Sequence, residues 1–527
     1  MLAALACGLM GYLLAWELVQ GIASPPAEIF DKPSFVLEAA SVYWKSLRIL
    51  TFLVLIGIVY TPGRTSGSRF SQILSQPARI LLASVVSIPA YTYGFAEYNW
   101  YTDQAYLADR LLIVASALLS LRYALFLPVL FLLCLTADGQ WSYVLPHDGE
   151  STNRHLFHHL LLFTSCLVPA LRLSRGTMEE TFFIETTSFV GAHYFAAAIG
   201  KMALGDSPYD WLLYNELGNL ALSFHLNGWP LLGHFNVEGA AHLLNRISLL
   251  IAGATLAIEL AGIVPVSFRK VFAALALARA GVHLGIFLLI GDLFWSWIAL
   301  DFVLAACVLG LRRSNQRLSP RSHAVWLPTL FALAVFLLAP TIPFAWFDSP
   351  LGHRFVVYVK DASGRHHELP DHFAAPFDLA LTHGHFEYLG GDERYAVSGC
   401  STTVDWNLYR DVQELNSVTS AREFLSGLPI QEGQTWKQEK FSVFCERLLV
   451  HLGNQSSPSR LSSFLDTVAP PAHIWTYPRA SRVWDPSIEP DGLVVVMHRH
   501  LFSEKALFEF DEKTIFQYPT TNDVDTH

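Results

Sequence analysis

Ionisable side chains lie within several long apolar stretches of this sequence, and they are the first candidates for chemistry. A charged or titratable group at such a depth is costly unless it faces a protein interior or an aqueous cavity. Histidine, lysine and carboxylate side chains in these surroundings can exchange protons or hold a polar ligand. The candidates are His155, His158, His159, Glu185, His193, Lys201, Glu259, Arg279, His283, Asp292 and Asp301.

Lys201 follows the apolar stretch 182–200, in which Ala196, Ala197, Ala198 and Gly200 permit close helix packing. Two interpretations are open. The amine can extend to the membrane interface and stay charged. Alternatively, burial keeps it neutral, and it can then accept a proton.

Three histidines open another apolar stretch. His155 and His159 are four residues apart and therefore share a helical face, and His158 is one turn from His155. The His-x-x-His-His pattern also occurs in membrane di-iron oxygenases and desaturases, but those enzymes need several such boxes. The membrane region has no second box, so we favour a hydrogen-bonded histidine cluster and expect no metal.

Arg279 and His283 are also four residues apart in an apolar stretch. The arginine can hold a neutral imidazole in place, or it can pair with a carboxylate such as Glu259 or Asp301. A purely structural pair inside a helical bundle is the alternative.

The elements that must position these residues are membrane helices. A helix needs about 20 apolar residues to cross roughly 30 Å of hydrocarbon. About eleven candidate spans occur, with 107–120 and 123–136 also readable as one broken helix. The spans lie near 2–19, 46–61, 80–96, 107–120, 123–136, 155–171, 182–200, 244–264, 272–290, 293–311 and 323–342. The sequence therefore predicts an α-helical polytopic membrane bundle, in contact with the lipid bilayer.

Composition and charge agree with a membrane protein. Hydrophobic residues make up 52% of the chain and charged residues 15%, and the mean hydropathy is +0.35, whereas soluble domains are about 25% charged. The net charge of −10 disfavours nucleic-acid binding. Twelve Lys and Arg residues fall in loops on one side and four in loops on the other. The positive-inside rule then predicts a cytoplasmic N-terminus and an extracytoplasmic C-terminal domain.

The segment 343–527 carries the whole acidic surplus, with 25 acidic and 15 basic residues. It has strand-like runs at 355–359, 492–497 and 501–510 and amphipathic helical patterns near 410–427 and 437–452. We therefore expect a soluble α+β or β-rich domain. It contains Cys400 and Cys445, which an outward-facing domain can pair as a disulfide, although two buried thiols are the alternative.

Three segments resemble the family of the vitamin K-dependent γ-carboxylase and the wider HTTM (horizontally transferred transmembrane) proteins. The run Tyr194 to Lys201, followed by Asp210-Trp211, is similar to the family's lysine motif. The run from His283 to Trp295 resembles the family's histidine, hydrophobic run and Ile-Gly turn. The run Asn153 to Phe157 resembles the Asn-His that opens a family span, with Arg154 inserted.

The resemblance implies three parts of the chain and a set of roles. Residues 1–104 would be additional N-terminal transmembrane helices, 105–342 the carboxylase-like core, and 343–527 the extracytoplasmic domain. Lys201 would be the base that deprotonates vitamin K hydroquinone or another quinol, with His155 and His283 in the quinone site. We also expect Tyr194, His193, His159, Trp211 and Arg279 to border the quinone.

By the same resemblance, oxygenation of the quinol by dioxygen to an epoxide would be coupled to proton removal from a substrate glutamate and its carboxylation by carbon dioxide. The protein or peptide substrate would approach from the outer face. Three departures oppose a direct transfer of the activity: Ala197-Ala198 replaces Ala-Gly, extra residues precede Asp210, and Phe294-Trp295 replaces Phe-Pro. A non-enzymatic membrane scaffold or transporter is the main alternative, and a di-iron oxygenase is the third.

Overall fold

The computed structural model describes most of the chain. The described residues are 2–20, 27–60, 74–96, 105–140, 145, 152–172, 178–231, 236–310, 326–341, 343–374, 377, 381, 386–391, 393–430, 435–454, 464–465, 467–503 and 506–519.

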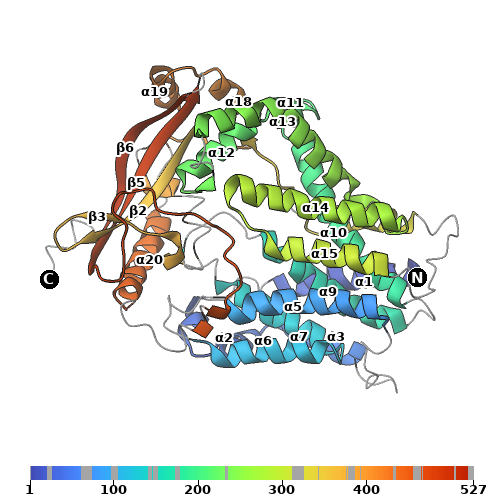
Figure 1. Cartoon of the computed structure of the whole chain (residues 1–527). Coiled ribbons are helices and arrows are strands. Elements are labelled where there is room, and N and C mark those ends of the chain that lie inside the picture. Colours follow the sequence, from blue (N-terminus) through green and yellow to red (C-terminus); the bar gives the residue numbers. More distant parts are fainter. Residues whose placement is uncertain are drawn as a thin grey trace.

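The first two thirds of the chain are helical, and the last third contains a β-sheet (Figure 1). The principal helices are α1 (Leu2–Val19), α2 (Phe35–Tyr43), α3 (Leu47–Tyr60), α5 (Gln76–Phe95), α6 (Leu107–Ser120), α7 (Phe126–Asp138), α9 (Thr152–Arg172), α10 (Met178–Met202), α11 (Asp210–Tyr214), α12 (Leu217–Leu226), α13 (Val237–Leu260), α14 (Arg269–Ile290), α15 (Trp295–Gly310) and α16 (Leu327–Leu338). Figure 1 shows α14, α15, α5 and α6 as successive layers with similar axis directions.

One apolar core joins the helices from α1 to α10 with α14, α15 and α16. Its members include Leu5, Phe131, Phe163, Phe189 and Leu304, all fully buried. Helix α10 packs against α16, α13 and the short 3-10 turn η4 (Ala261–Ile263). A Cβ atom at Gly191 would lie 2.1 Å from the carbonyl oxygen of Gly262. Glycine at this position therefore lets the two backbones touch, and α10 becomes a central element of the bundle.

The expected number of spans is corrected by the structure. Four helices in the described part of the chain are long and apolar enough to cross a membrane: Leu2–Val19, Gln76–Phe95, Val237–Ile263 and Arg269–Ile290. Four further apolar helices are shorter: Phe126–Asp138, His155–Val168, Trp295–Gly310 and Leu327–Leu338. Helices of 12 to 16 residues, such as α16 and α15, reach only about 18–24 Å, which is less than the roughly 30 Å of a hydrocarbon core.

The C-terminal part is built on a four-stranded antiparallel sheet in the order β3-β2-β5-β6. The strands are β2 (Leu351–Asp361), β3 (His366–Glu368), β5 (Pro490–Ser503) and β6 (Ala506–Tyr518). A small second sheet pairs β1 (Phe347–Asp348) with β4 (Thr402–Thr403). The prediction of an α+β domain agrees with this sheet and with the helices α18 (Trp406–Gln413), α19 (Val418–Gly427) and α20 (Thr435–Asn454).

Alternate residues of β2 and β5 determine how the sheet packs. Phe355, Val357 and Val359 share one face of β2, as the two-residue period of a strand requires. They form a cluster with Phe441 and Leu448 of α20. Arg354 lies on the opposite face, directly across from His498 of β5. The sheet therefore buries its apolar face against α20, and its other face carries basic residues.

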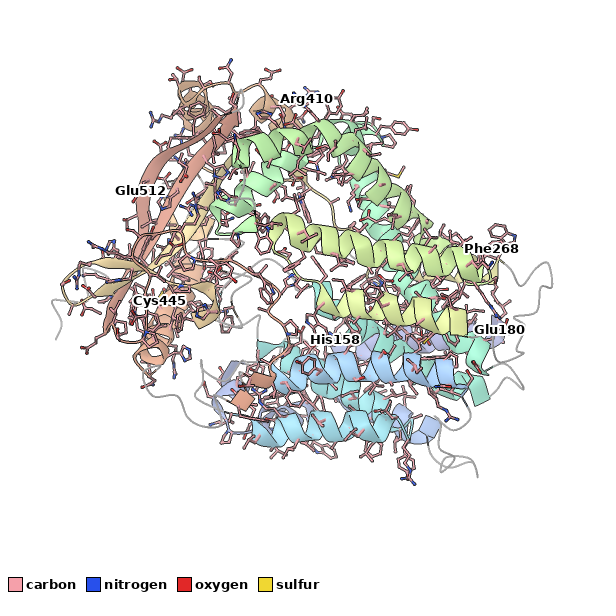
Figure 2. The ribbon with its side chains drawn as sticks, in the orientation of Figure 1. His158, Glu180, Phe268, Arg410, Cys445 and Glu512 are labelled. Carbon is pink, nitrogen blue, oxygen red and sulfur yellow. The ribbon has the colours of Figure 1, made fainter. Side chains whose placement is uncertain are left out.

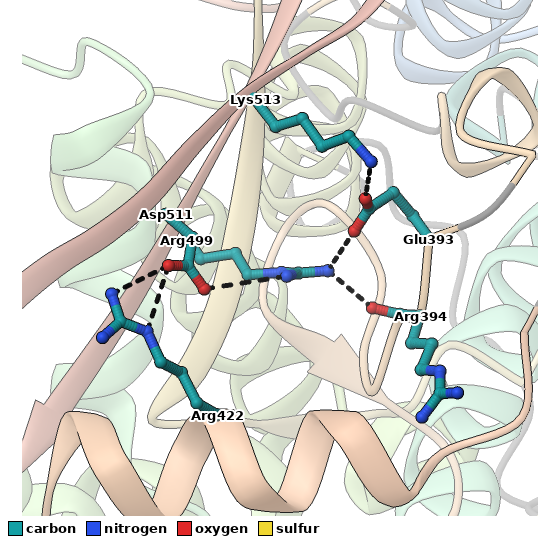
Figure 3. Close-up of polar contacts among 6 residues, drawn as sticks. All are labelled: Glu393, Arg394, Arg422, Arg499, Asp511 and Lys513. Atoms are coloured by element: carbon teal, nitrogen blue, oxygen red, sulfur yellow. Dashed lines mark hydrogen bonds and ion pairs between the residues drawn. The ribbon is translucent and has the colours of Figure 1, made fainter.

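Charged residues tie the sheet to its surroundings (Figure 3). Arg499 donates to Glu393 Oε2 at 2.8 Å and to the carbonyl of Arg394 at 2.9 Å, and Lys513 also pairs with Glu393. Arg422 of α19 binds Asp511 at 2.9 Å from a largely exposed position. This network fixes the 393–394 loop and α19 on the β5–β6 hairpin.

Cys400 and Cys445, the disulfide candidates, are not bonded to each other. Cys445 packs in the α20 cluster, beside Phe441 and Phe444. Cys400 packs with Phe224 and Trp229 at the end of α12. Of the two alternatives for these cysteines, the structure agrees with two buried thiols, because they belong to separate apolar clusters.

A segment of the C-terminal part, residues 473–480, returns to the helical part, and we call it the strap. Leu293 N–H donates to the carbonyl of His473 at 2.7 Å, and Trp475 N–H donates to the carbonyl of Gly291 at 3.1 Å. Tyr477 N–H donates to the carbonyl of Gly228. Gly228 and Gly291 have φ values of +102° and +82°, which glycine adopts readily. The strap is thus paired with both the α12 end and the α14–α15 turn.

Candidate functional site

Helix α10 carries His193, Tyr194 and Lys201, and these positions define two polar clusters. Tyr194 and Lys201 are seven residues apart, which places them on one face, separated by about 10 Å along the helix. Figure 2 shows His158, on the neighbouring α9, within the helical bundle. Phe268 and Glu180 lie at one end of the bundle, and Cys445 of α20 and Glu512 of β6 lie in the C-terminal part on the other side. Lys201 is on the sheet side, because Phe344 contacts it.

Tyr194 is the centre of a buried hydrogen-bond network. Its hydroxyl donates to Asp301 Oδ2 at 2.6 Å and lies 2.8 Å from His283 Nε2. Asp301 Oδ1 accepts from Arg279 Nε at 3.0 Å and from a terminal nitrogen of Arg279 at 2.8 Å. The guanidinium also lies over the Tyr194 ring, 4.8 Å from its centroid. The ion pair between α14 and α15 thereby fixes the position of the tyrosine hydroxyl.

The network also determines how His283 is protonated in its neutral form. Because the tyrosine hydroxyl gives its hydrogen to Asp301, His283 Nε2 must be the donor to the tyrosine oxygen. His283 Nδ1 then carries the lone pair, and this buried atom has no partner among the residues that the structure describes. His283 thus presents a hydrogen-bond acceptor.

His193 is arranged in the same way. Its Nδ1 lies 2.9 Å from the carbonyl of Phe189, so Nδ1 carries the hydrogen and Nε2 is the acceptor. His193 Nε2 is buried and, within the described ranges, unpartnered. The ring lies 6.4 Å from the ring of Trp297, which in turn lies 5.6 Å from that of His283.

Trp297 of α15 links the two histidines and adds a donor. Its indole Nε1 is buried and has no acceptor in the described part of the chain. We call His193, Tyr194, His283 and Trp297 the aromatic cluster. It presents two acceptor nitrogens and one donor nitrogen around a single tryptophan, with Phe294 completing the wall at 5.0 Å from His283.

The other predicted histidines adjoin the aromatic cluster. His159 stacks near His193, with ring centroids 6.0 Å apart, and its Nδ1 bonds to the hydroxyl of Tyr12 on α1 at 2.8 Å. His155 lies 6.4 Å from His159 and is half-buried. The structure therefore brings the rings of His155, His159 and His193 close to one another.

Lys201 and Glu259 form a separate unit that we call the lysine pair. Lys201 Nζ lies 2.8 and 2.9 Å from the two oxygens of Glu259 and 3.3 Å from the carbonyl of Phe344. It also lies 5.4 Å from the ring centroid of Trp211. The lysine therefore has an acceptor for each ammonium hydrogen. It is not hydrogen-bonded to the aromatic cluster.

A buried acid lies close to the lysine pair. Asp348 accepts hydrogen bonds from Asn215 Nδ2 at 2.9 Å and from Trp346 Nε1 at 3.0 Å. Burial raises the pKa of Asp348 to about 7, although these hydrogen bonds and the charge of Lys201 act in the opposite direction. Asp348 connects α11 and α12 with the start of the sheet domain.

Sequence reasoning found part of this site. Asp301, one of two carboxylates considered for Arg279, is its partner, whereas Glu259 pairs with Lys201. Sequence reasoning missed Tyr12, Trp297 and Phe294, because aromatic residues in apolar stretches resemble ordinary core. It also missed the strap. No group of three or more His, Cys, Asp or Glu side chains in the described part of the chain is arranged to hold a metal ion.

Comparisons with protein families, with curated proteins and with solved structures find no match to this chain.

Proposed function

We propose that the protein is a membrane enzyme that uses a quinol, resembling the vitamin K-dependent γ-carboxylases. One observation carries the proposal. The aromatic cluster presents two acceptor nitrogens, His283 Nδ1 and His193 Nε2, and one donor, Trp297 Nε1, all buried and unpartnered among the described residues. A quinol has two hydroxyl groups, each of which can donate and accept, and a flat ring that suits aromatic walls.

The hydrogen-bonding groups of the aromatic cluster suit those of a quinol. Leaving buried polar atoms without partners costs about 1–3 kcal/mol each, and a ligand with hydroxyl groups would remove that cost. A bound quinol would supply the electrons for oxygen activation, which in the family is coupled to proton removal from a glutamate and its carboxylation. The side chains of the cluster would hold the ring and keep water away from the reacting groups.

The lysine pair is suited to proton transfer by one route. The Lys201 ammonium has no free lone pair, so it must first pass a proton to a Glu259 oxygen 2.8 Å away. The result would be a neutral amine beside a neutral acid. Lys201 Nζ would then be the basic atom, as the family resemblance implies.

The membrane arrangement is part of the same proposal. Four helices are apolar and long enough to span a bilayer, and the shorter apolar helices would pack beside them in one bundle. The N-terminus would be cytoplasmic and the sheet domain extracytoplasmic, on the side of Lys201, where a protein substrate would arrive.

Epoxidation of vitamin K hydroquinone by the purified protein tests the reaction without knowledge of the protein substrate. Wild type should form epoxide, Lys201→Ala should form none, and Glu259→Gln should lose turnover while it still binds quinol. Glu423→Gln, at an exposed position of α19, is the matched control and should retain activity. No turnover by folded wild type with several quinols would contradict the proposal.

A non-enzymatic scaffold or transporter is the second candidate. The observation that favours it is the lysine pair itself, because every ammonium hydrogen of Lys201 has an acceptor, as in a structural salt bridge. Under this alternative, Glu259→Gln would lower thermal stability without any effect on a quinol reaction, and no quinol would bind at the aromatic cluster.

A further inference from the structure

A small cavity lies where the C-terminal end of α12 meets the sheet. It has a volume of about 40 Å³, and its polar lining comes from Asn227, Arg354, Glu368 and Asp371. Asn227 caps α12, Arg354 is on β2, and Glu368 is on β3. The cavity is therefore formed jointly by the helical part and the C-terminal part, away from the aromatic cluster and the lysine pair.

Two hydrogen-bond donors that line this cavity have no acceptor. Arg354 Nε and Asn227 Nδ2 are both buried and, among the residues that the structure describes, unpartnered. The Arg354 side chain is only 11% exposed. Leaving a charged group's donor unsatisfied in such a place is expensive. A bound acceptor would satisfy both donors.

The other contacts of Arg354 do not supply that acceptor. One terminal nitrogen donates to the carbonyl of Leu226, at the end of α12. The other approaches Glu509 at 3.8 Å, and Glu509 is 43% exposed and is shared with Arg479 at 3.7 Å. Two guanidinium groups therefore share one loosely held carboxylate, and neither contact uses Arg354 Nε–H.

Two more basic side chains face the same region. His498 is directly across the sheet from Arg354, and His225 is one residue before the end of α12. His498 Nε2 and His225 Nδ1 are also buried without partners in the described part of the chain. Burial and the charges of Arg354 and Arg479 lower the pKa values of both histidines. They are therefore neutral near pH 7 and leave the positive charge to the arginines.

The two carboxylates that line the cavity limit the charge of an occupant. Glu368 accepts from the backbone N–H groups of Arg479 and Ala480, and Asp371 accepts from the Thr476 hydroxyl. These donors offset their charges in part. A phosphate, with a charge near −2 and at least three exposed oxygens, would meet repulsion and too few donors. A planar monoanion with two oxygens matches two donors.

We propose that this cavity binds a small carboxylate, with one oxygen accepting from Arg354 Nε–H and the other from Asn227 Nδ2–H. The ligand would join α12 to the sheet at the place where the strap also crosses, since Arg479 donates to the carbonyl of Leu226 at 3.3 Å. The proposal is independent of any quinol reaction.

Calorimetric titration of the full chain in detergent with sodium acetate tests this site. Wild type should bind acetate and should bind neither phosphate nor chloride at equal ionic strength. Arg354→Lys keeps the charge but lacks Nε–H, and Asn227→Asp places a carboxylate beside Arg354. Each should weaken acetate binding about tenfold or more, because a hydrogen bond to a charged group is lost. Arg422→Gln, at an exposed pair on α19, is the control and should bind as wild type does.

A second measurement needs no variant. Acetate should protect Arg354 of the wild-type protein from an arginine-selective dicarbonyl reagent, as read by mass spectrometry of the peptide, while Arg422 remains reactive. If acetate neither binds nor protects, or if all variants bind it equally, the cavity holds water only and the proposal is wrong.

Discussion

The aromatic cluster and the lysine pair lie two turns apart on α10, yet they differ in how their polar atoms are satisfied. In the lysine pair, Lys201 has three acceptors and Glu259 has two contacts to the amine. In the aromatic cluster, His193, His283 and Trp297 each leave one buried nitrogen without a partner in the described part of the chain. The pair is complete as it stands, whereas the cluster has three polar atoms that a ligand would satisfy. In our proposal, the cluster binds the ligand and the pair holds the proton.

The largest expected effect comes from the ion pair that supports the aromatic cluster. Asp301→Leu leaves the Arg279 guanidinium, 1% exposed, without its carboxylate, and should cost about 3–5 kcal/mol of folding free energy. Thermal unfolding in micelles measures the loss. The double variant Arg279→Met, Asp301→Leu removes both charges and should recover most of the stability. A single variant as stable as wild type would show that the pair does not support the cluster.

Asp348, beside the lysine pair, should make stability depend on pH. Its pKa is raised from 3.8 to about 7 in the folded protein. Between these values the folded protein holds a proton that the unfolded chain has released. The contribution of Asp348 to stability should therefore be complete below pH 4 and should fall by up to about 1.4 kcal/mol per pH unit as the pH rises to 7.

The slope of unfolding free energy against pH is the readout for this prediction. The Asp348→Asn variant has no acid to ionise at this position. It should therefore show a smaller slope of unfolding free energy between pH 4 and 7, whatever its absolute stability. Asp485→Asn, at an exposed turn of the sheet domain, should leave the slope between pH 5 and 7 as in wild type. An unchanged slope in Asp348→Asn would mean that the acid is already ionised in the folded protein.

Trp297→Phe tests whether the aromatic cluster is a ligand site, and its expected effect is smaller than that of Asp301→Leu. It removes the indole N–H, which bonds to nothing in the described part of the chain, so the loss of stability should be that of the smaller ring alone, about 1–2 kcal/mol. Quinone affinity should fall about threefold to tenfold. Trp484→Phe, whose indole donates to the carbonyl of Ile488 at 3.1 Å, should lower stability and leave quinone affinity unchanged. The reverse pattern would contradict a ligand site at Trp297.

The smallest effect is expected at the exposed ion pair in Figure 3. Arg422 is 57% exposed, so solvent screens its attraction to Asp511, and Arg422→Gln should change the unfolding free energy by less than about 1 kcal/mol. Chemical or thermal denaturation measures it. A loss comparable to that of Asp301→Leu would show that exposure does not distinguish the ion pairs of this protein.

The helices could be predicted from the sequence better than the number of spans. Runs of apolar residues identify buried helices by themselves, and α14 and α13 follow closely the stretches 272–290 and 244–264. The break between the stretches 107–120 and 123–136 agrees with the end of α6 at Ser120 and the start of α7 at Phe126. Hydropathy did not reveal that several apolar helices are too short to span a bilayer. Polar residues also lower the mean hydropathy of α9 and α10. These residues face the protein interior.

The site could be predicted only where residue type is informative. A lysine, an arginine or a histidine in an apolar run stands out, so Lys201, Arg279 and His283 were found. Trp297 and Tyr12 were not, since an aromatic residue in an apolar helix is usually core. The contact of His473 with Leu293 joins positions 180 residues apart, and no local pattern in the strap predicts such a contact.

Photolabelling with an azido-quinone in lipid nanodiscs tests the central claim most directly. Mass spectrometry would locate the label along the chain, with excess vitamin K as competitor. The account predicts labelling on α10 near His193 and on α15 near Trp297, abolished by the competitor and reduced in Trp297→Phe. Labelling that is absent, or that is unaffected by the competitor, would contradict a quinol site in the aromatic cluster.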